Sequence, residues 1–242
     1  MHVVAVLGHA VHLRNFIGSG CLAMLVDRGH ELTLVVPGDA LGQVATETAS
    51  WPTHPVVLPL EPVMPSRGRR MLRSWAHLAS FVHRRRFPTY AHKLRMGVRH
   101  PRWRTRMRYL VQTGVARAME AFVDLEEFWR AFESQLPPER PAVDLLAVLR
   151  PDVLFTATSI HDGTEVELVK AAQAIGVPVI AFAGSWDNLT SKGMFYVMPD
   201  HLLVWGEENR EQAITHHGFR PEQITVTGAP HFDVYATIGK GL

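Results

Sequence analysis

Short apolar runs alternate with segments of helical periodicity along most of the chain. Seven apolar runs predict buried strands, at residues 2–7, 31–36, 55–60, 153–156, 177–182, 201–205 and 224–226. Apolar side chains recur at helical spacing in four segments, at residues 15–28, 142–149, 164–175 and 207–217. Strands that alternate with helices predict an α/β fold: a Rossmann-like, mostly parallel sheet with helices on both faces.

Residues 62–138 do not follow this alternation and are predicted to be a basic helical insertion, with helical periodicity around residues 72–82 and 110–132. Fourteen Lys and Arg lie between Arg67 and Arg108, and no Asp or Glu lies between Pro62 and Met119. Aromatic side chains interleave with these arginines, at Trp75, Phe81, Phe87, Tyr90, Trp103 and Tyr109.

Three interpretations of the basic stretch 67–108 stay open. It can be a solvated arginine face, a surface that docks on anionic lipid headgroups, or a nucleic-acid contact. No helix-turn-helix, zinc finger or RNA-binding aromatic motif accompanies it, so no specific nucleic acid is expected. Of the two binding interpretations, an anionic membrane surface is therefore the partner expected through residues 67–108.

Composition narrows the class of protein. The 242 residues are 47% hydrophobic and 20% charged, which is ordinary for a globular protein, and the formal net charge is +2. A single cysteine, Cys21, excludes an intramolecular disulfide and a multi-cysteine zinc site. No run approaches the roughly 20 apolar residues of a spanning helix, and the N-terminus lacks a basic segment before its apolar run. The expected location is cytoplasmic, with a peripheral position on the inner membrane face as a further option.

Ligands of open parallel sheets bind outside the carboxyl ends of the strands. This rule selects the connection after the first strand. There Gly8 allows a ligand to approach the backbone, the helix N-terminus favours an anion, and His9 and Arg14 can do acid–base or anion-binding chemistry. His9 is a candidate catalytic acid or base, and Gly8 and Arg14 are candidate substrate-binding residues. The alternative is that the histidines only cap and solvate the loop. The pattern G-x-G-x-x-G of a dinucleotide site is absent.

A second candidate loop follows the strand at 153–156. His161 and Asp162 are candidate catalytic residues there, as a proton acceptor and as a group that orients a sugar hydroxyl. The alternative is helix capping, because Asp162 or Thr164 followed by Glu165 or Glu167 resembles a capping pattern.

Two more loops complete the predicted rim. The stretch SWDNLTSK supplies an aromatic ring, hydroxyls, an amide and charges for substrate binding, at Ser185, Trp186, Asp187, Asn188 and Lys192. Its alternative is a turn that bonds to itself, since Asp, Asn and Ser form turns. In GAPHFD, Gly228 and Pro230 are substrate-binding candidates, with a tight turn as the alternative. No cofactor is expected, and no metal site, because the fourteen histidines include no His-x-x-x-His pair with an added carboxylate.

Several of these segments together resemble a known family. The strand-Gly-His opening, DRGHELTLVVP and RPDVLFTATS resemble the N-terminal domain of GT-B-fold glycosyltransferases. Later segments resemble bacterial enzymes of surface-polysaccharide assembly, the CDP-glycerol glycerophosphotransferases and UDP-GlcNAc 2-epimerase relatives, namely SWDNLTSKG, LLVWGEENREQAITHHGF and ITVTGAPHFD. The resemblance covers residues 1–60 and 141–235, and nothing in the basic insertion matches it.

The resemblance implies that residues 1–235 form the acceptor-binding half of a glycosyltransferase. Such an enzyme moves a sugar, or a glycerol-phosphate-like group, from a nucleotide-activated donor to a cell-surface glycan or lipid-linked acceptor. The family's second, nucleotide-binding domain would be expected at residues 236–242, where only a short tail follows. We therefore expect a C-terminal domain in cis or a partner chain to hold the donor, and no activity without it.

The resemblance also implies roles for single residues. In this family the first domain often carries the base that deprotonates the acceptor hydroxyl, which here would be His9, His161 or Asp162. Arg14 and Lys192 would balance phosphate charge. Two alternatives remain: a non-catalytic membrane-docking subunit of a two-chain enzyme, and half of a UDP-sugar 2-epimerase-like enzyme.

Overall fold

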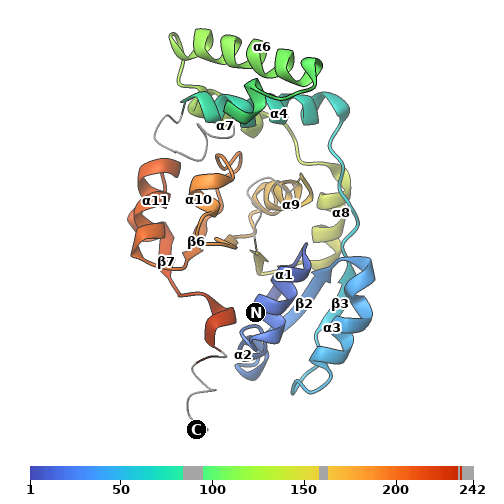
Figure 1. Ribbon diagram of the computed structural model, residues 1–242. Helices are drawn as coiled ribbons and strands as arrows, with labels where there is room; N and C mark the ends of the chain where they lie inside the picture. The colour runs from blue at the N-terminus through green and yellow to red at the C-terminus, as the bar shows by residue number, and fades with distance from the viewer. Residues whose placement is uncertain (84–94, 158–162, 234, 236–242) are drawn as a thin grey trace.

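The computed structural model describes residues 1–83, 95–157, 163–233 and 235 (Figure 1). At its centre lies one seven-stranded parallel sheet with the order β3-β2-β1-β4-β5-β6-β7. The strands are β1 (His2–Val6), β2 (Glu31–Val36), β3 (Val56–Pro59), β4 (Val153–Thr156), β5 (Val179–Phe182), β6 (His201–Val204) and β7 (Ile224–Val226). The expected Rossmann-like α/β sheet is confirmed, and every strand pair in it is parallel.

Helices connect the strands and cover both faces of the sheet. Those before β3 are α1 (Ala10–Leu13), η1 (Arg14–Gly18), α2 (Ala23–Asp27), η2 (Gly38–Ala40) and α3 (Leu41–Thr48). Between β3 and β4 lie α4 (Arg67–His83), α6 (Trp103–Glu120), α7 (Leu125–Gln135) and α8 (Arg140–Leu149). The remaining ones are α9 (Gly163–Ala174), α10 (Asn188–Ser191), α11 (Glu207–His217), η3 (Pro221–Gln223) and η4 (Pro230–Phe232).

Alternation along β1 explains why both faces are covered. Val3 and Ala5 join the apolar cluster formed with α1, η1, α2 and α3. Val4 and Val6 point to the opposite face and pack with α8 and α9. A strand whose successive side chains are all apolar buries both of its faces, which is typical of a parallel sheet.

The first predicted helix differs from the structure. A continuous helix over residues 15–28 was expected, but the helical structure begins earlier, with α1 at Ala10, and passes through the π-helical turn η1 to Gly18. It resumes as α2 only at Ala23. Gly20 has φ of 75°, a left-handed conformation that an α-helix does not contain. Two glycines within three residues therefore end one helix and allow the chain to turn before the next.

The basic insertion forms a layer of helices outside α8 and α9 (Figure 1). Within the stretch 67–108, two arginines point inward, so a solvated arginine face does not describe all of it. Arg73 contacts Glu133 of α7 at 2.6 Å and Glu167 of α9 at 2.5 Å, while Arg69 lies 3.3 Å from Glu167. Lys170 completes the cluster at 2.7 Å from Glu133. These buried charges attach the insertion to the sheet domain.

Charge pairing outweighs burial in this cluster for two of its members. Burial opposes the charge of Arg73, but hydrogen bonds and attraction to Glu133 and Glu167 raise its pKa above the usual value. Burial likewise disfavours ionised Glu133, yet Arg73 and Lys170 lower the pKa of that carboxyl. For Lys170 burial dominates and lowers the pKa. Among the helices within the described ranges, none is long and apolar enough to cross a membrane.

Candidate functional site

The carboxyl ends of all seven strands lie at one edge of the sheet, because every pair is parallel. We call this the carboxyl edge. The connections after β1, β5 and β7 leave from it, and each carries residues selected from the sequence. The connection after β4 leaves from it too, but Ser159, His161 and Asp162 lie outside the described residues.

The β1 connection places an exposed histidine at the centre of this edge. Leu7 is fully buried, and the chain then emerges at Gly8 and exposes His9 before α1 begins. His9 is the N-cap of α1, its carbonyl accepts from the amide of His12 at 2.9 Å, and the two rings contact each other edge to face. Arg14 is exposed one turn further on. Both charged or titratable candidates, His9 and Arg14, therefore face solvent at this edge.

A buried carboxylate lies directly beneath this connection. Glu165, in the first turn of α9, is 1% exposed and accepts a hydrogen bond from Thr156 Oγ1 at 3.1 Å. A methyl group on Gly8 would lie 3.0 Å from Glu165 Oε1. β1 and β4 are neighbours here, and their crossovers run in opposite directions along the sheet, which makes this its topological switch point.

From the sequence, Glu165 was considered as a helix-capping residue and, in the epimerase alternative, as one of the carboxylates near the sugar. In the structure the side chain of Glu165 points to the sheet. The hydroxyl of the neighbouring Thr164 accepts a hydrogen bond from the amide of Val63 at 3.2 Å, which ties the segment after β3 to the start of α9. The sequence signal for this arrangement was weak, since an acid in the first turn of a helix is common.

The β5 connection is a compact turn whose polar side chains form hydrogen bonds mainly with one another. The carboxylate of Asp187 accepts from the hydroxyls of Ser185 at 2.7 Å and Ser191 at 2.8 Å. Burial disfavours the charge, but these hydrogen bonds outweigh it and lower the pKa of Asp187. Asn188 is buried, at the start of α10. The self-bonded turn considered as the alternative for this stretch is therefore present.

Two side chains of the same turn remain directed to solvent. Trp186 is 68% exposed, and Lys192 is exposed as well. The carbonyl of Trp186 accepts from Asn209 Nδ2 at 2.8 Å, which fixes the turn to the first part of α11. An indole held on an anchored backbone, with its ring in water, can stack on a ligand without prior rearrangement.

The β7 connection crosses back over the carboxyl edge toward the first helix. Gly228, with φ of 79°, and half-buried Pro230 lead into η4, which packs against η1. The ring of His231 contacts Trp205 at 5.1 Å between centroids. Burial lowers the pKa of His231, and the positive charge of Arg14 lowers it further. The structure thus brings two predicted loops together, those that carry Arg14 and Pro230.

Two buried polar atoms at this junction have no hydrogen-bond partner among the described residues, Trp205 Nε1 and His231 Nδ1. A buried polar group without a partner costs about 1–3 kcal/mol. A water molecule, an ion or a ligand can supply the missing partner of such a group. Neither residue was a candidate from the sequence, because only the fold brings the ends of β6 and β7 against η1.

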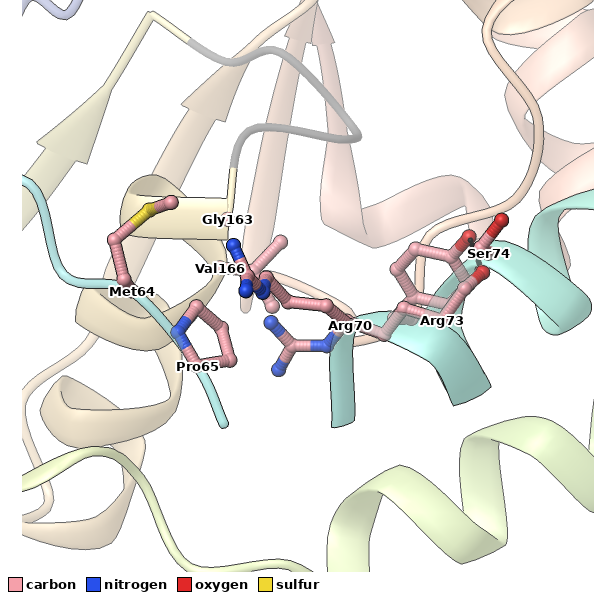
Figure 2. Close-up of a pocket in the computed structure, with 8 residues that line it drawn as sticks. Met64, Pro65, Arg70, Arg73, Ser74, Gly163 and Val166 are labelled. Atoms are coloured by element: carbon pink, nitrogen blue, oxygen red, sulfur yellow. Dashed lines mark hydrogen bonds between the residues drawn. The ribbon is translucent and has the colours of Figure 1, made fainter. Parts of the chain in front are cut away.

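A cavity of about 440 Å³ lies beside the N-terminus of α9 (Figure 2). Figure 2 shows Arg70, Arg73 and Ser74 of α4 facing Gly163 and Val166 of α9, with Met64 and Pro65 beside them. Arg73 is held by the buried cluster, whereas Arg70 is exposed and pairs with no carboxylate among the described residues. The cavity joins the carboxyl edge to the insertion.

Metal-ligating residues do not cluster at this edge: within the described ranges, no group of three or more His, Cys, Asp or Glu could hold an ion. Cys21 is half-buried, and burial, followed by the charge of Asp233, raises the pKa of its thiol.

Comparisons with known proteins give similarities of structure only. No family model and no curated protein matches the chain. Among solved structures, the glycotransferase of kitacinnamycin is 14% identical, with a TM-score of 0.41 over 94% of this chain and 51% of the other. The glycosyltransferase VinC in complex with DTDP is 14% identical, with a TM-score of 0.38 over 99% and 44%.

Arabidopsis thaliana UGT89C1 complexed with UDP-L-rhamnose is 15% identical, with a TM-score of 0.37 over 97% of this chain and 55% of its own. The chain therefore spans about half the length of the solved structures it matches.

Proposed function

We propose that this chain is the acceptor-binding half of a GT-B glycosyltransferase. It would help to move a sugar, or a glycerol-phosphate-like group, from a nucleotide-activated donor to a cell-surface glycan or lipid-linked acceptor. The observation that carries the proposal is the carboxyl edge, where His9, Arg14 and Trp186 are all exposed. The sequence resemblance to the family's N-terminal domain supports it as well.

Each exposed group suits one part of an acceptor. The ring of Trp186 can stack on a sugar, because aromatic faces pack well against apolar sugar surfaces. His9 can accept the proton of the attacking hydroxyl, because a neutral imidazole carries one nitrogen that acts as a hydrogen-bond acceptor. Arg14, which is exposed, can pair with a phosphate.

The donor nucleotide would be held elsewhere, by a second domain in cis or by a partner chain. This follows from the resemblance to a two-domain family, in which the active site lies between the domains. The carboxyl edge of this chain would then form one wall of that site.

A binding experiment on the chain itself tests the proposal. The labelled chain is applied to an array of bacterial and synthetic oligosaccharides, and uridine, thymidine and cytidine diphosphates are titrated separately. We expect retention of a subset of glycans and weaker binding of the nucleotides. Trp186→Ala should reduce glycan retention by roughly tenfold, since about 1.4 kcal/mol of stacking corresponds to that factor.

Phe122→Ala is the matched control, because Phe122 is 89% exposed in the connection between α6 and α7, away from the carboxyl edge. Its retention should equal that of the unchanged chain. Tight nucleotide binding with no glycan retained would contradict the acceptor role, and so would a Trp186→Ala variant that binds glycans normally.

A further inference from the structure

Helix α6 has its apolar side facing away from the protein. Its buried side chains are polar or small, namely Gln112, Thr113 and Ala116. Its exposed side chains include the large apolar ones, Trp103 (66%), Met107 (45%), Leu110 (43%), Val111 (54%) and Val115 (40%). Their spacing of four, three, one and four residues places them on one side of a helix. This arrangement is the reverse of an ordinary surface helix.

Arginines lie along both edges of this apolar face. At 3.6 residues per turn, Arg106 and Arg117 project along one edge and Arg108 along the other, while Arg104 projects just inside that second edge. All four are exposed. No acidic residue lies on the first seventeen positions of α6, and Glu120 is its last residue. The face is therefore apolar in the middle and positive at its margins.

A cavity of about 570 Å³ adjoins the edge that carries Arg108. It lies between α4 and α6, and three guanidinium groups line it, from Arg67, Arg70 and Arg108. Within the described residues no carboxylate pairs with any of the three. Trp75 and Val111 supply apolar wall. Three guanidinium groups above an apolar wall suit a phosphate that carries a hydrophobic chain.

Among the described residues, no other element covers this face of α6. The helix lies across α4 on the outer side of the insertion, at the end of the molecule farthest from β3 and α3 (Figure 1). A stripe of large exposed apolar side chains on a monomer marks a contact surface.

We propose that the outward face of α6 docks into the headgroup region of an anionic lipid bilayer, and that the cavity lined by Arg67, Arg70 and Arg108 binds a lipid phosphate. A helix with a basic margin and with Trp and Leu on its apolar side lies in the interface plane of such a bilayer. A second copy of this chain is a poorer occupant, because two such faces would bring arginines against arginines. The inference does not depend on the proposed glycosyl transfer.

Vesicle sedimentation of the full chain tests the inference. Vesicles of phosphatidylcholine with about one third phosphatidylglycerol are compared with vesicles of phosphatidylcholine alone, near 0.1 M salt. We expect binding to the anionic vesicles and little to the neutral ones. The triple variant Arg104→Gln, Arg106→Gln, Arg108→Gln should bind roughly 100-fold more weakly, since each arginine near an anionic surface contributes about fivefold.

Two further measurements test how deeply α6 enters the bilayer and whether its apolar face makes the contact. Trp103 fluorescence, taken as the difference between the chain and Trp103→Phe, should be quenched by brominated lipid. Leu110→Ser should also weaken vesicle binding. The matched control is Val148→Ser with Arg140→Gln, because Val148 is 79% exposed and the Arg140 side chain 90% exposed on α8, well away from α6.

Three results would overturn the inference. The triple variant could bind anionic vesicles as tightly as the unchanged chain, or the unchanged chain could bind neutral vesicles as tightly as anionic ones. The control variant could also lose as much vesicle binding as Leu110→Ser. A dimer in solution that Leu110→Ser dissociates, without vesicle binding, would assign the face to a second copy instead. All substituted side chains are exposed, so circular dichroism should show an unchanged fold in each variant. Vesicle binding by a chain that retains no glycan would leave this inference standing and end the proposed function.

Discussion

Gly8 is the residue at which the sheet, the first connection and α9 meet most closely. Its place opposite Glu165 leaves little room for a side chain, because a methyl group there would lie 3.0 Å from a carboxylate oxygen of a buried residue, which would have to shift. The residue was selected from the sequence for the approach of a ligand. The structure supplies a second reason for glycine, which is the approach of Glu165.

Gly8→Ala should therefore lower the free energy of unfolding by about 1–3 kcal/mol, the usual cost of an added group in a packed site. Gly42→Ala is the matched control: Gly42 lies in α3, and nothing stands within 4 Å of the position that an added methyl group would take. That variant should be more stable by about 0.5–1 kcal/mol, because alanine favours a helix. Urea unfolding measures both, and equal stability of Gly8→Ala and the unchanged chain would show that Glu165 moves aside freely.

Among the elements, α4 shows most clearly what holds the insertion in place. Its inward arginines meet carboxylates on α7 and α9, and Glu167 is completely buried. A buried pair contributes little compared with apolar packing, but removal of one partner leaves an isolated charge. The cluster therefore fixes the position of α4 more than it adds to total stability.

Arg73→Leu should lower the free energy of unfolding by about 3–5 kcal/mol, because it removes the cation that both Glu133 and Glu167 contact. The exposed pair of Arg140 with Asp144 on α8 is the control, and Arg140→Gln should change stability by less than about 1 kcal/mol. Denaturant titration compares the two. A loss below about 1 kcal/mol for Arg73→Leu would mean that the cluster is open to water.

Sequence periodicity predicted the strands and the helical character of the insertion. The helix expected over residues 110–132 is divided in the structure, however, between α6, which ends at Glu120, and α7, which begins at Leu125. β1 and β2 are short runs of mostly apolar residues, and such a run predicts a strand buried on both faces wherever it lies in the order of the sheet. The direction of Arg73 could not be predicted, since its partners lie 60 and 94 residues away. The break after Gly18 was predictable in principle, because Gly18 and Gly20 are both unfavourable inside a helix.

For the whole molecule, the parallel sheet decides where chemistry can gather. Strand direction alone assigns Gly8, Trp186 and Pro230 to one edge, so the sequence sufficed to select that edge. It did not suffice for the unpartnered atoms of Trp205 and His231, whose burial results from η4 packing against η1. The carboxyl edge and the outward face of α6 lie on different parts of the molecule, so a ligand and a membrane could be bound together.

Hydrogen–deuterium exchange, with and without the glycan that the array retains best, tests the role of the carboxyl edge most directly. Residues 7–14, 185–192 and 227–233 should exchange more slowly in the presence of the glycan, because the ligand covers the loops that leave β1, β5 and β7. Residues 50–55 and 175–178, at the opposite edge of the sheet, should be unchanged. Protection confined to that opposite edge, or to α4 and α6, would contradict the account.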